Sequence, residues 1–208
     1  MPDHYNNFQE LNQHQHLEID YRIHSVAQPH PLVILAIHAG GIELGTSELA
    51  LAIAGNDYSI YLFEGLRKGK NERLHLTSTH FDEPQCLDLV QKHQHALSIH
   101  GFTANPSDPE IYLGGTHQLF IQHMLQSLQT NGYLAQVNTQ KFGATDPRNI
   151  CNRTQNGMGL QIEIAGGLRQ RFFSNYFTHI GRKTITPHFT HFVQIIRQTL
   201  EADQYLTN

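Results

Sequence analysis

The chain has 208 residues, a net charge of −4 and 39% hydrophobic residues. This length is typical of one domain with a substantial core, and the acidic balance without a basic stripe argues against a nucleic-acid-binding protein. The polar start lacks the apolar core of a signal peptide, and no apolar run approaches the roughly 20 residues of a membrane helix. We expect a monomeric protein without a membrane partner, either cytoplasmic or released by a route that uses no signal.

Apolar periodicity divides the chain into short strands and amphipathic helices. Strands are predicted at residues 32–37, 58–63, 74–79, 96–99, 111–113, 134–137 and 159–165. Helices are predicted at residues 46–55, 84–94, 116–130 and 187–206. This alternation predicts a single α/β domain over residues 1–208, with a mixed, mostly parallel sheet flanked by helices. Residues 1–30 are weakly patterned and predict only a short helix or an edge strand within 9–23.

Three polar side chains follow predicted buried strands. His38 ends the apolar run at 32–37, Glu43 stands five residues later on a glycine-containing loop, and His100 ends the strand at 96–99. Open α/β sheets bind ligands outside the carboxyl ends of their strands. Two histidines and a carboxylate are a familiar ligand set for catalytic zinc, with a fourth position left for water. A histidine at a strand end is more often a hydrogen-bonded structural residue, so the pattern alone leaves both roles open.

Glu163 is a candidate general base on the strand predicted at 159–165. Apolar residues alternate there with Gln161 and Glu163, which turns the carboxylate away from the apolar face. A carboxylate beside a metal site can take a proton from water and deliver it to a leaving nitrogen.

The helix after the first strand has Thr46 or Ser47 as a candidate cap, and the helix at 84–94 has Asp82.

Four segments resemble the poly-γ-glutamate hydrolase family of phages and bacteria, a group of zinc hydrolases similar to carboxypeptidases. They are AIHAGGIELGTSELA at 36–50, LHLTSTHFDEP at 74–84, LSIHGF at 97–102 and NICNRTQNGMGLQIEIAGGLR at 149–169. The resemblance implies a zinc-carboxypeptidase-like fold with one zinc ion per chain. It implies His38, Glu43 and His100 as metal ligands, Glu163 as the catalytic carboxylate, and hydrolysis of γ-glutamyl amide bonds.

The substrate class that this resemblance implies is an anionic polymer or peptide whose units carry free carboxylates. Arginine binds carboxylates well because its guanidinium donates two parallel hydrogen bonds. Asn152 and Arg153 resemble the substrate-carboxylate pair of carboxypeptidases, so Arg153 is the first candidate. Arg148 and Arg169 are further candidates.

His80, Asp82 and Glu83 follow the strand predicted at 74–79, so they could border the cleft. Substrate contact by His80 and support of a ligand histidine are two interpretations of this cluster. Capping of the next helix by Asp82 is the third, and the sequence does not choose among them.

Two other functions stay open. One is a zinc carboxypeptidase or deacylase acting on a small γ-glutamyl or acyl-amino acid substrate. The other is a non-enzymatic, phage-related protein with a vestigial or structural metal site. A structural zinc site usually has four protein ligands, and only three candidates are found here. The two cysteines, Cys86 and Cys151, are expected to be buried as small apolar residues.

Overall fold

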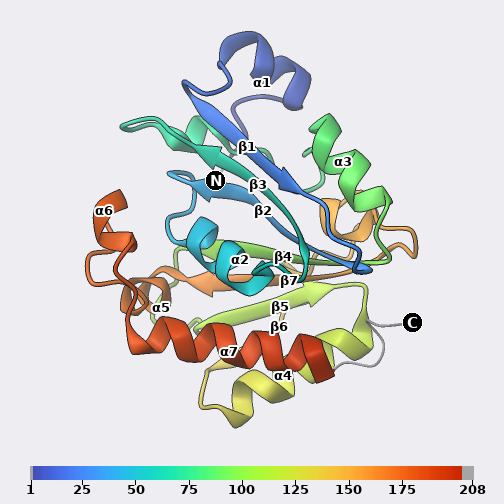
Figure 1. The fold of residues 1–208 in the computed structure, drawn as a ribbon, viewed down its shortest axis with the longest axis vertical. Coiled ribbons are helices and arrows are strands. Elements are labelled where there is room, and N and C mark those ends of the chain that lie inside the picture. The colour runs from blue at the N-terminus through green and yellow to red at the C-terminus, as the bar shows by residue number, and fades with distance from the viewer. Residues whose placement is uncertain (1, 203–208) are drawn as a thin grey trace.

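The computed structural model describes residues 2–202, which form a central sheet with helices on both faces (Figure 1). The strands are β1 (Tyr21–Val26), β2 (Leu32–Gly40), β3 (Ser59–Gly65), β4 (His95–Phe102), β5 (Ile111–Gly115), β6 (Ala135–Val137) and β7 (Met158–Ala165). The helices are α1 (Phe8–His14), α2 (Thr46–Ala54), α3 (Pro84–Gln91), α4 (Gln118–Thr130), α5 (Gly166–Arg171), α6 (His179–Arg182) and α7 (Pro187–Ala202). Two short 3-10 helices are η1 (Asn71–Leu74) and η2 (Ile150–Asn152).

The sheet has the order β1-β3-β2-β4-β7-β5-β6. Its central strands β3, β2, β4 and β7 are parallel to their neighbours in this group. β1 is antiparallel to β3 at one side, and β5 is antiparallel to β7 toward the other, where β6 runs parallel to β5. The predicted single α/β domain with a mixed, mostly parallel sheet is therefore confirmed.

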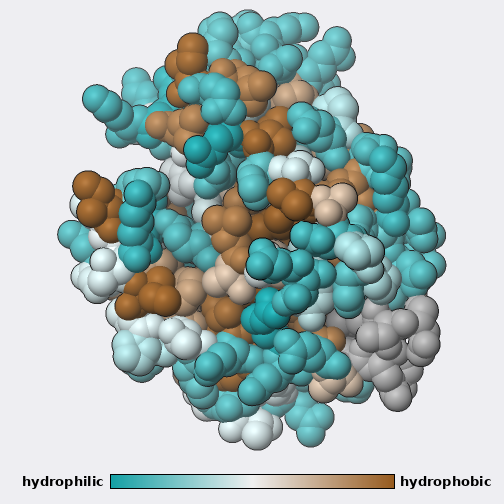
Figure 2. Space-filling model, viewed as in Figure 1, coloured by the Kyte–Doolittle hydropathy of each residue, from teal (hydrophilic) through white to brown (hydrophobic). Residues whose placement is uncertain are grey.

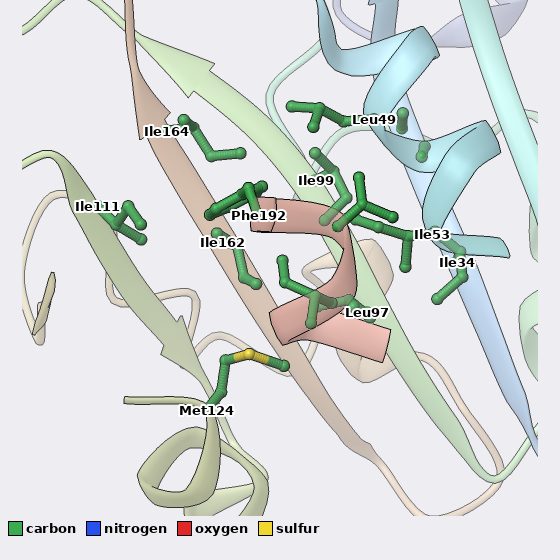
Figure 3. Packing of buried hydrophobic residues seen from close by; sticks show 14 of the residues in the cluster. Ile34, Leu49, Ile53, Leu97, Ile99, Ile111, Met124, Ile162, Ile164 and Phe192 are labelled. Carbon is green, nitrogen blue, oxygen red and sulfur yellow. The ribbon is translucent and has the colours of Figure 1, made fainter. Parts of the chain in front are cut away.

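Two apolar clusters cover the two faces of the sheet. On one face, α2, α4 and α7 pack on strand residues such as Ile34, Leu97 and Ile162 (Figure 3). On the other face, α1 and α3 pack on a second cluster that includes Leu35 and Phe63. Successive residues of each buried strand pack alternately in the two clusters. Both faces of these strands are therefore apolar, which explains the continuous apolar runs in the sequence.

One predicted strand and two predicted helix caps are wrong. Residues 75–79 form a loop after η1. Leu74 and Leu76 alternate as in a strand, but they pack in the apolar cluster beneath α1 and α3 instead of pairing in the sheet. The cap of α3 is Glu83, whose carboxylate accepts the N–H groups at 85 and 86, whereas Asp82 accepts the N–H of Phe8. Gly45 occupies the cap position of α2, so neither Thr46 nor Ser47 caps that helix.

The other predicted elements are present close to their predicted bounds, whereas the short helices α5 and α6 were not predicted. The segment 9–23 contributes to both of its alternatives, the helix α1 and the edge strand β1. α7 begins at Pro187 as expected, and its predicted last turn at 203–206 lies outside the described residues. Cys86 and Cys151 are buried and unpaired, as expected.

The surface in the view of Figure 2 is mainly hydrophilic. An apolar group stands out at its left edge over α6, where Phe177 and Ile180 are 72% and 79% exposed. Within residues 2–202, no helix has the length and apolar character needed to cross a membrane.

Candidate active site

The fold creates a crevice at the carboxyl ends of β2 and β4. β3 and β4 lie on opposite sides of β2, and their connecting helices α2 and α3 pack on opposite faces of the sheet. The ladder between β2 and β4 ends at the pair Leu35–Ser98, so the two strands separate before His38 and His100. Such a switch point is where open α/β sheets bind ligands. A cavity of about 530 Å³ opens there, lined by β2, β4, β7 and the loops at 75–79 and 140–149.

A β-bulge aims His38 into this cavity. Ile37 and His38 of β2 together face the single residue Phe63 of β3. Strict alternation would turn His38 away from the face on which Ile37 packs, whereas a bulge re-aims the side chain. The ring instead reaches that face, where its Nε2 donates to the carbonyl oxygen of Leu76 at 2.8 Å.

The turn after β2 places Glu43 beside His38. Gly40 has a φ of 66°, which a residue with a side chain adopts with strain. The hydroxyl of Ser47 accepts the Gly40 N–H at 2.7 Å and donates to the carboxylate of Glu64 at 2.8 Å. The N–H of Glu43 donates to the carbonyl oxygen of His38 at 2.8 Å. Ser47 therefore braces the turn that carries Glu43.

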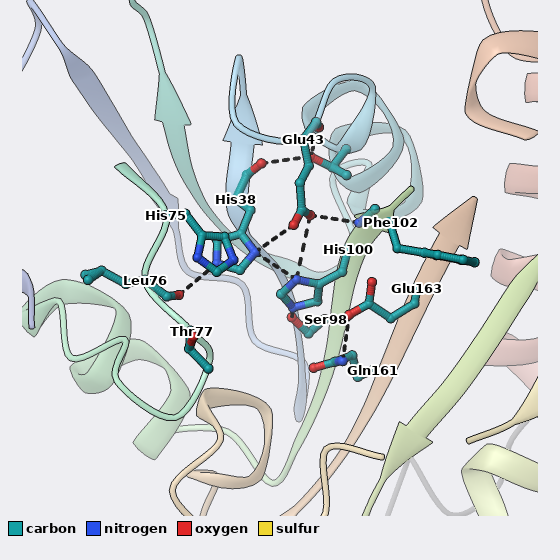
Figure 4. A network of polar contacts seen from close by, with 12 residues as sticks. His38, Glu43, His75, Leu76, Thr77, Ser98, His100, Phe102, Gln161 and Glu163 are labelled. Atoms are coloured by element: carbon teal, nitrogen blue, oxygen red, sulfur yellow. Dashed lines mark hydrogen bonds and ion pairs between the residues drawn. The ribbon is translucent and has the colours of Figure 1, made fainter. Parts of the chain in front are cut away.

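The structure brings His38, Glu43 and His100 together, as the sequence predicts (Figure 4). Nδ1 of His38 lies 3.0 Å from Oε1 of Glu43 and 3.1 Å from Nδ1 of His100. Nδ1 of His100 lies 3.8 Å from Oε2 of Glu43. The other nitrogen of His100, Nε2, is 2.8 Å from the hydroxyl of Ser98. Both histidines thus use Nε2 for a contact with the protein and turn Nδ1 toward the shared carboxylate.

His75 is a fourth member of this cluster, and the sequence analysis missed it. Its ring stacks on that of His38 with centroids 4.1 Å apart, and its Nδ1 lies 2.8 Å from a carboxylate oxygen of Asp3. His38, Glu43 and His75 can also bring one ligand atom each to within 4.8 Å of one another. The one sequence signal for His75 is its position between two leucines. That pattern was interpreted as part of the strand predicted at 74–79.

Burial and charge leave the cluster ready for a cation. Burial acts to raise the pKa of Glu43, but His38, His100 and the Gly101 N–H outweigh it and lower the pKa to about 2. Burial and the charge of His38 lower the pKa of His100 to about 3 and that of His75 to about 4. Burial also acts to lower the pKa of His38, yet Glu43 outweighs it and leaves it raised. At neutral pH Glu43 is therefore ionised, and two of the imidazoles are neutral.

Glu163 lies beside the cluster on the next strand. It is in register with His100 across the β4–β7 ladder, and its carboxylate turns toward the same space (Figure 4). Its Oε1 accepts a hydrogen bond of 2.9 Å from the side chain of Gln161. Burial, and then the charge of Glu43, raises the pKa of Glu163 well above its ordinary value. The predicted alternation is observed, since Glu163 lines the cavity while Ile162 packs in the core.

Comparison with known proteins identifies the family. The model of the poly-gamma-glutamate hydrolase family matches residues 5–195. The chain belongs to this family. It is 37% identical over 206 residues to the SPbeta prophage-derived UPF0714 protein YoqZ of Bacillus subtilis strain 168, in a match that covers 98% of this chain and 73% of that protein.

Two solved structures share the fold of this hydrolase family member over nearly its whole length. A bacteriophage poly-gamma-glutamate hydrolase superimposes with a TM-score of 0.92 at 35% identity, covering 98% of this chain and 99% of that one. The zinc-free form of YndL, a Bacillus subtilis protein, superimposes with a TM-score of 0.91 at 34% identity, covering 97% and 98%. That structure of YndL is described as zinc-free.

The four residues expected to bind the hydrolase substrate lie outside the described lining of the cavity: Asn152, Arg153, Arg169 and His80. The guanidinium of Arg169 is buried and donates to the carbonyl oxygens of Leu44 and Ile164 at 2.5 and 3.0 Å. It also donates to the hydroxyl of Tyr176 at 2.8 Å. Arg169 therefore joins α5 to the turn before α2 and to β7.

The other three candidates also lie outside this lining. The side-chain amide of Asn152 donates to the carbonyl oxygens of Ala144 and Asp146 at 2.7 and 3.0 Å. Arg153 ends η2 close enough to Cys86 to oppose the rise that burial causes in the pKa of that thiol. Nδ1 of His80 lies 2.9 Å from a carboxylate oxygen of Asp3, and its side chain is 53% exposed. The structure does not bring these residues to the cavity.

Loops supply the rest of the lining, and they differ in chemistry from the strand ends. The loop at 75–79 contributes hydroxyl groups, and the loop at 140–149 contributes amides, a carboxylate and Lys141. Asp146 of that lining pairs at 2.6 Å with Arg148, which is exposed and is not among the described lining residues. Among the described lining residues, Lys141 is the one lysine or arginine. No motif in the sequence singles out this lysine.

Proposed function

We propose that this chain hydrolyses the γ-glutamyl amide bonds of poly-γ-glutamate with a zinc ion held by His38, Glu43 and His100. The observation that carries the proposal is the convergence of two Nδ1 atoms and one carboxylate within 3.0–3.8 Å of one another. Two ligand atoms on one tetrahedral zinc ion lie about 3.3–3.4 Å apart, as bond lengths near 2.0–2.1 Å require. The three residues therefore fit the ion without rearrangement of the backbone.

The partners of these side chains support the same donor set. Zinc-binding histidines commonly donate their second ring nitrogen to a carbonyl or another protein group, which fixes the ring and the tautomer. His38 does so to Leu76, and His100 lies at hydrogen-bond distance from Ser98. Ionised Glu43 and neutral His100 are the forms that bind a metal, whereas His38, whose pKa Glu43 raises, has to lose its ring proton when the metal binds. His75 serves as a neighbour of the site in this proposal, because its contacts with the cluster are looser.

Zinc, when bound, supplies an acidified water and polarises the scissile carbonyl group. Glu163 then acts as the general base. Its raised pKa makes its carboxylate a stronger base than an exposed glutamate, which favours removal of a proton from water at neutral pH. The protonated Glu163 next gives that proton to the nitrogen of the leaving unit, so the carboxylate is restored. Gln161 holds the carboxylate in place through its 2.9 Å hydrogen bond.

The substrate class comes from the family and from the phage poly-gamma-glutamate hydrolase of the same fold. Its chemistry agrees with the cavity, because carboxylate-bearing units need donors and the loops offer hydroxyl, amide and ammonium groups. A metal site that is vestigial would leave no activity, so one experiment separates the two functions.

That experiment combines metal analysis of the purified protein with an assay on poly-γ-glutamate. We expect one zinc ion per chain, release of shorter glutamyl chains, and loss of this release when a chelator removes the metal. Zinc would restore the activity on addition. A fully metal-loaded protein that leaves poly-γ-glutamate intact would refute the proposed function.

A further inference from the structure

The cavity has an unusual charge balance for a site that takes a polyanion. Its described lining holds the carboxylates of Glu43, Asp146 and Glu163 but a single side chain of permanent positive charge, Lys141. A carboxylate that leaves water needs a charged or hydrogen-bonding partner. Since Glu43 faces the histidines and Asp146 faces Arg148, the group most available to an incoming carboxylate is the ammonium of Lys141.

The ammonium of Lys141 is not consumed by contacts within the protein. Across residues 2–202, no carboxylate lies at ion-pair distance from it. Its Nζ lies 4.8 Å from the centroid of the neighbouring Phe142 ring, an arrangement that holds a cation without neutralising it. Its charge opposes the effects, burial first, that raise the pKa of Glu163. It also adds to the Asn105 hydrogen bond that lowers the pKa of Asp108, so both carboxylates lie within electrostatic reach of the ammonium.

The loop that carries Lys141 is fixed on both sides. Before it, the side chain of Asn138 accepts the N–H groups at 140 and 142, at 2.8 and 3.3 Å. After it, the N–H of Gly115 donates to the carbonyl oxygen of Gly143 at 2.7 Å, and Asn152 donates to that of Ala144. A loop held in this way presents its cation in one place before substrate arrives, which lowers the entropy cost of binding.

Close packing against β5 adds to this restraint. A Cβ atom on Gly114 would lie 2.2 Å from the carbonyl oxygen of Phe142, so the loop rests directly on the strand. The Phe142 ring packs with Phe102 and Tyr112 at centroid distances of 5.1 and 5.4 Å. The residue next to Lys141 is thereby anchored in an aromatic cluster at the cavity wall.

We propose that Lys141 is the specificity-determining residue that binds the free α-carboxylate of the glutamyl unit whose nitrogen leaves. This inference rests on the proposed function. In a γ-linked chain that carboxylate stands two bonds from the scissile nitrogen, to which Glu163 delivers its proton. In an α-linked chain the same position is an uncharged amide, and the carboxylate lies farther out on the side chain. A cation that lines the same cavity as Glu163 therefore distinguishes the γ linkage from the ordinary peptide linkage.

The test compares Lys141→Met with Lys141→Arg, and Lys183→Met serves as the matched control. Lys183 is an exposed lysine outside the cavity lining, so its replacement changes net charge equally. Two substrates are used with each zinc-loaded variant: a γ-linked glutamyl oligomer with free α-carboxylates, and the same oligomer with those groups converted to amides. Zinc content and Tm are measured for every variant.

We expect Lys141→Met to lower kcat/KM on the carboxylate oligomer by about 10- to 100-fold, mainly through KM, as loss of a charged hydrogen bond predicts. It should change kcat/KM on the amide oligomer little, so that the preference for free carboxylates disappears. Lys141→Arg should keep most of the preference, and Lys183→Met all of it.

Three results would overturn the inference. Lys141→Met could match Lys183→Met on the carboxylate oligomer, or it could lose equally on both oligomers, or it could lose zinc in parallel with activity. Each of these leaves the proposed function standing, because the wild-type protein still cleaves. A zinc-loaded wild-type protein that cleaves neither oligomer would overturn the proposed function, and the inference with it.

Discussion

Two parts of the cavity wall are built differently. The strand-end cluster, His38, Glu43, His100 and Glu163, is 2–8% exposed and lies on or directly after strands of the sheet. The rim loops, residues 75–79 and 140–149, are partly exposed and are held by contacts with Asp3 and Gly115, which lie far from them in the sequence. Strands fix side chains precisely enough for bond chemistry, whereas loops can vary to suit a substrate. We therefore assign the chemistry to the first part and recognition to the second.

The sharpest way to break this assignment is Glu163→Gln. The amide keeps the shape and the hydrogen-bonding capacity of the side chain but cannot take a proton from water. We expect kcat to fall at least about 10³-fold while zinc content stays at one per chain. Steady-state kinetics on poly-γ-glutamate and metal analysis measure the two quantities.

Glu110→Gln is the control for this variant. Glu110 is a carboxylate outside the cavity lining that pairs with Arg171, so its loss should leave kcat near the wild-type value. Near-normal turnover by Glu163→Gln would mean that another residue is the general base. It would also contradict the assignment of the chemistry to the strand-end cluster.

The sequence revealed the strand-end cluster because burial and sheet topology leave a local pattern. An unbroken apolar run points to a parallel strand, and His38 stands at its end. Alternation around Glu163 points the carboxylate away from the core. Even here one feature was invisible: the bulge at Ile37 and His38 depends on pairing with β3, which no local pattern encodes.

The rim loops escaped prediction for a physical reason. The leucines at 74 and 76 alternate as in a strand, but they are buried by tertiary packing, so His75 was overlooked. Lys141 stands in a polar stretch without periodicity, and contacts with Asn152 and Gly115, as well as with nearby Asn138, set its place. Of the candidate arginines, Arg169 donates hydrogen bonds to backbone carbonyl groups and Arg148 pairs with Asp146. Residue type and resemblance indicated a cation, but only the folded chain shows which one faces the cavity.

The second prediction compares a strand histidine with a loop histidine. His100→Ala removes a proposed ligand, and we expect zinc affinity to fall by more than about 100-fold. His75→Ala removes a neighbour of the site, and about a 10-fold loss is expected, as for groups that orient ligands. Competition with a chromophoric chelator measures both affinities. A larger loss for His75→Ala than for His100→Ala would make His75 the third ligand and extend the metal site into the loops.

The smallest expected effect concerns the stability of the metal-free protein, and it tests the opposite charge states of two strand-end carboxylates. Glu163 has its pKa raised above the ordinary 4.5, so it contributes stability below pH 4.5 that is lost as pH rises through its folded pKa. Glu43 has its pKa lowered to about 2, so its contribution is present above pH 4.5 and is lost as pH falls toward 2.

Replacing each glutamate by glutamine should reveal that the two side chains change the stability of the protein with pH in opposite directions. With the metal removed by a chelator, the Tm of Glu163→Gln should exceed that of the wild type by an amount that grows as pH rises above 4.5 and vanishes below it. Glu43→Gln should be less stable than the wild type above pH 4.5, with the difference shrinking as pH falls. Comparing each variant with the wild type at the same pH removes the contributions of all other groups. Parallel slopes for the two variants would mean that both carboxylates titrate alike, which would remove the electrostatic distinction between the metal ligand and the general base.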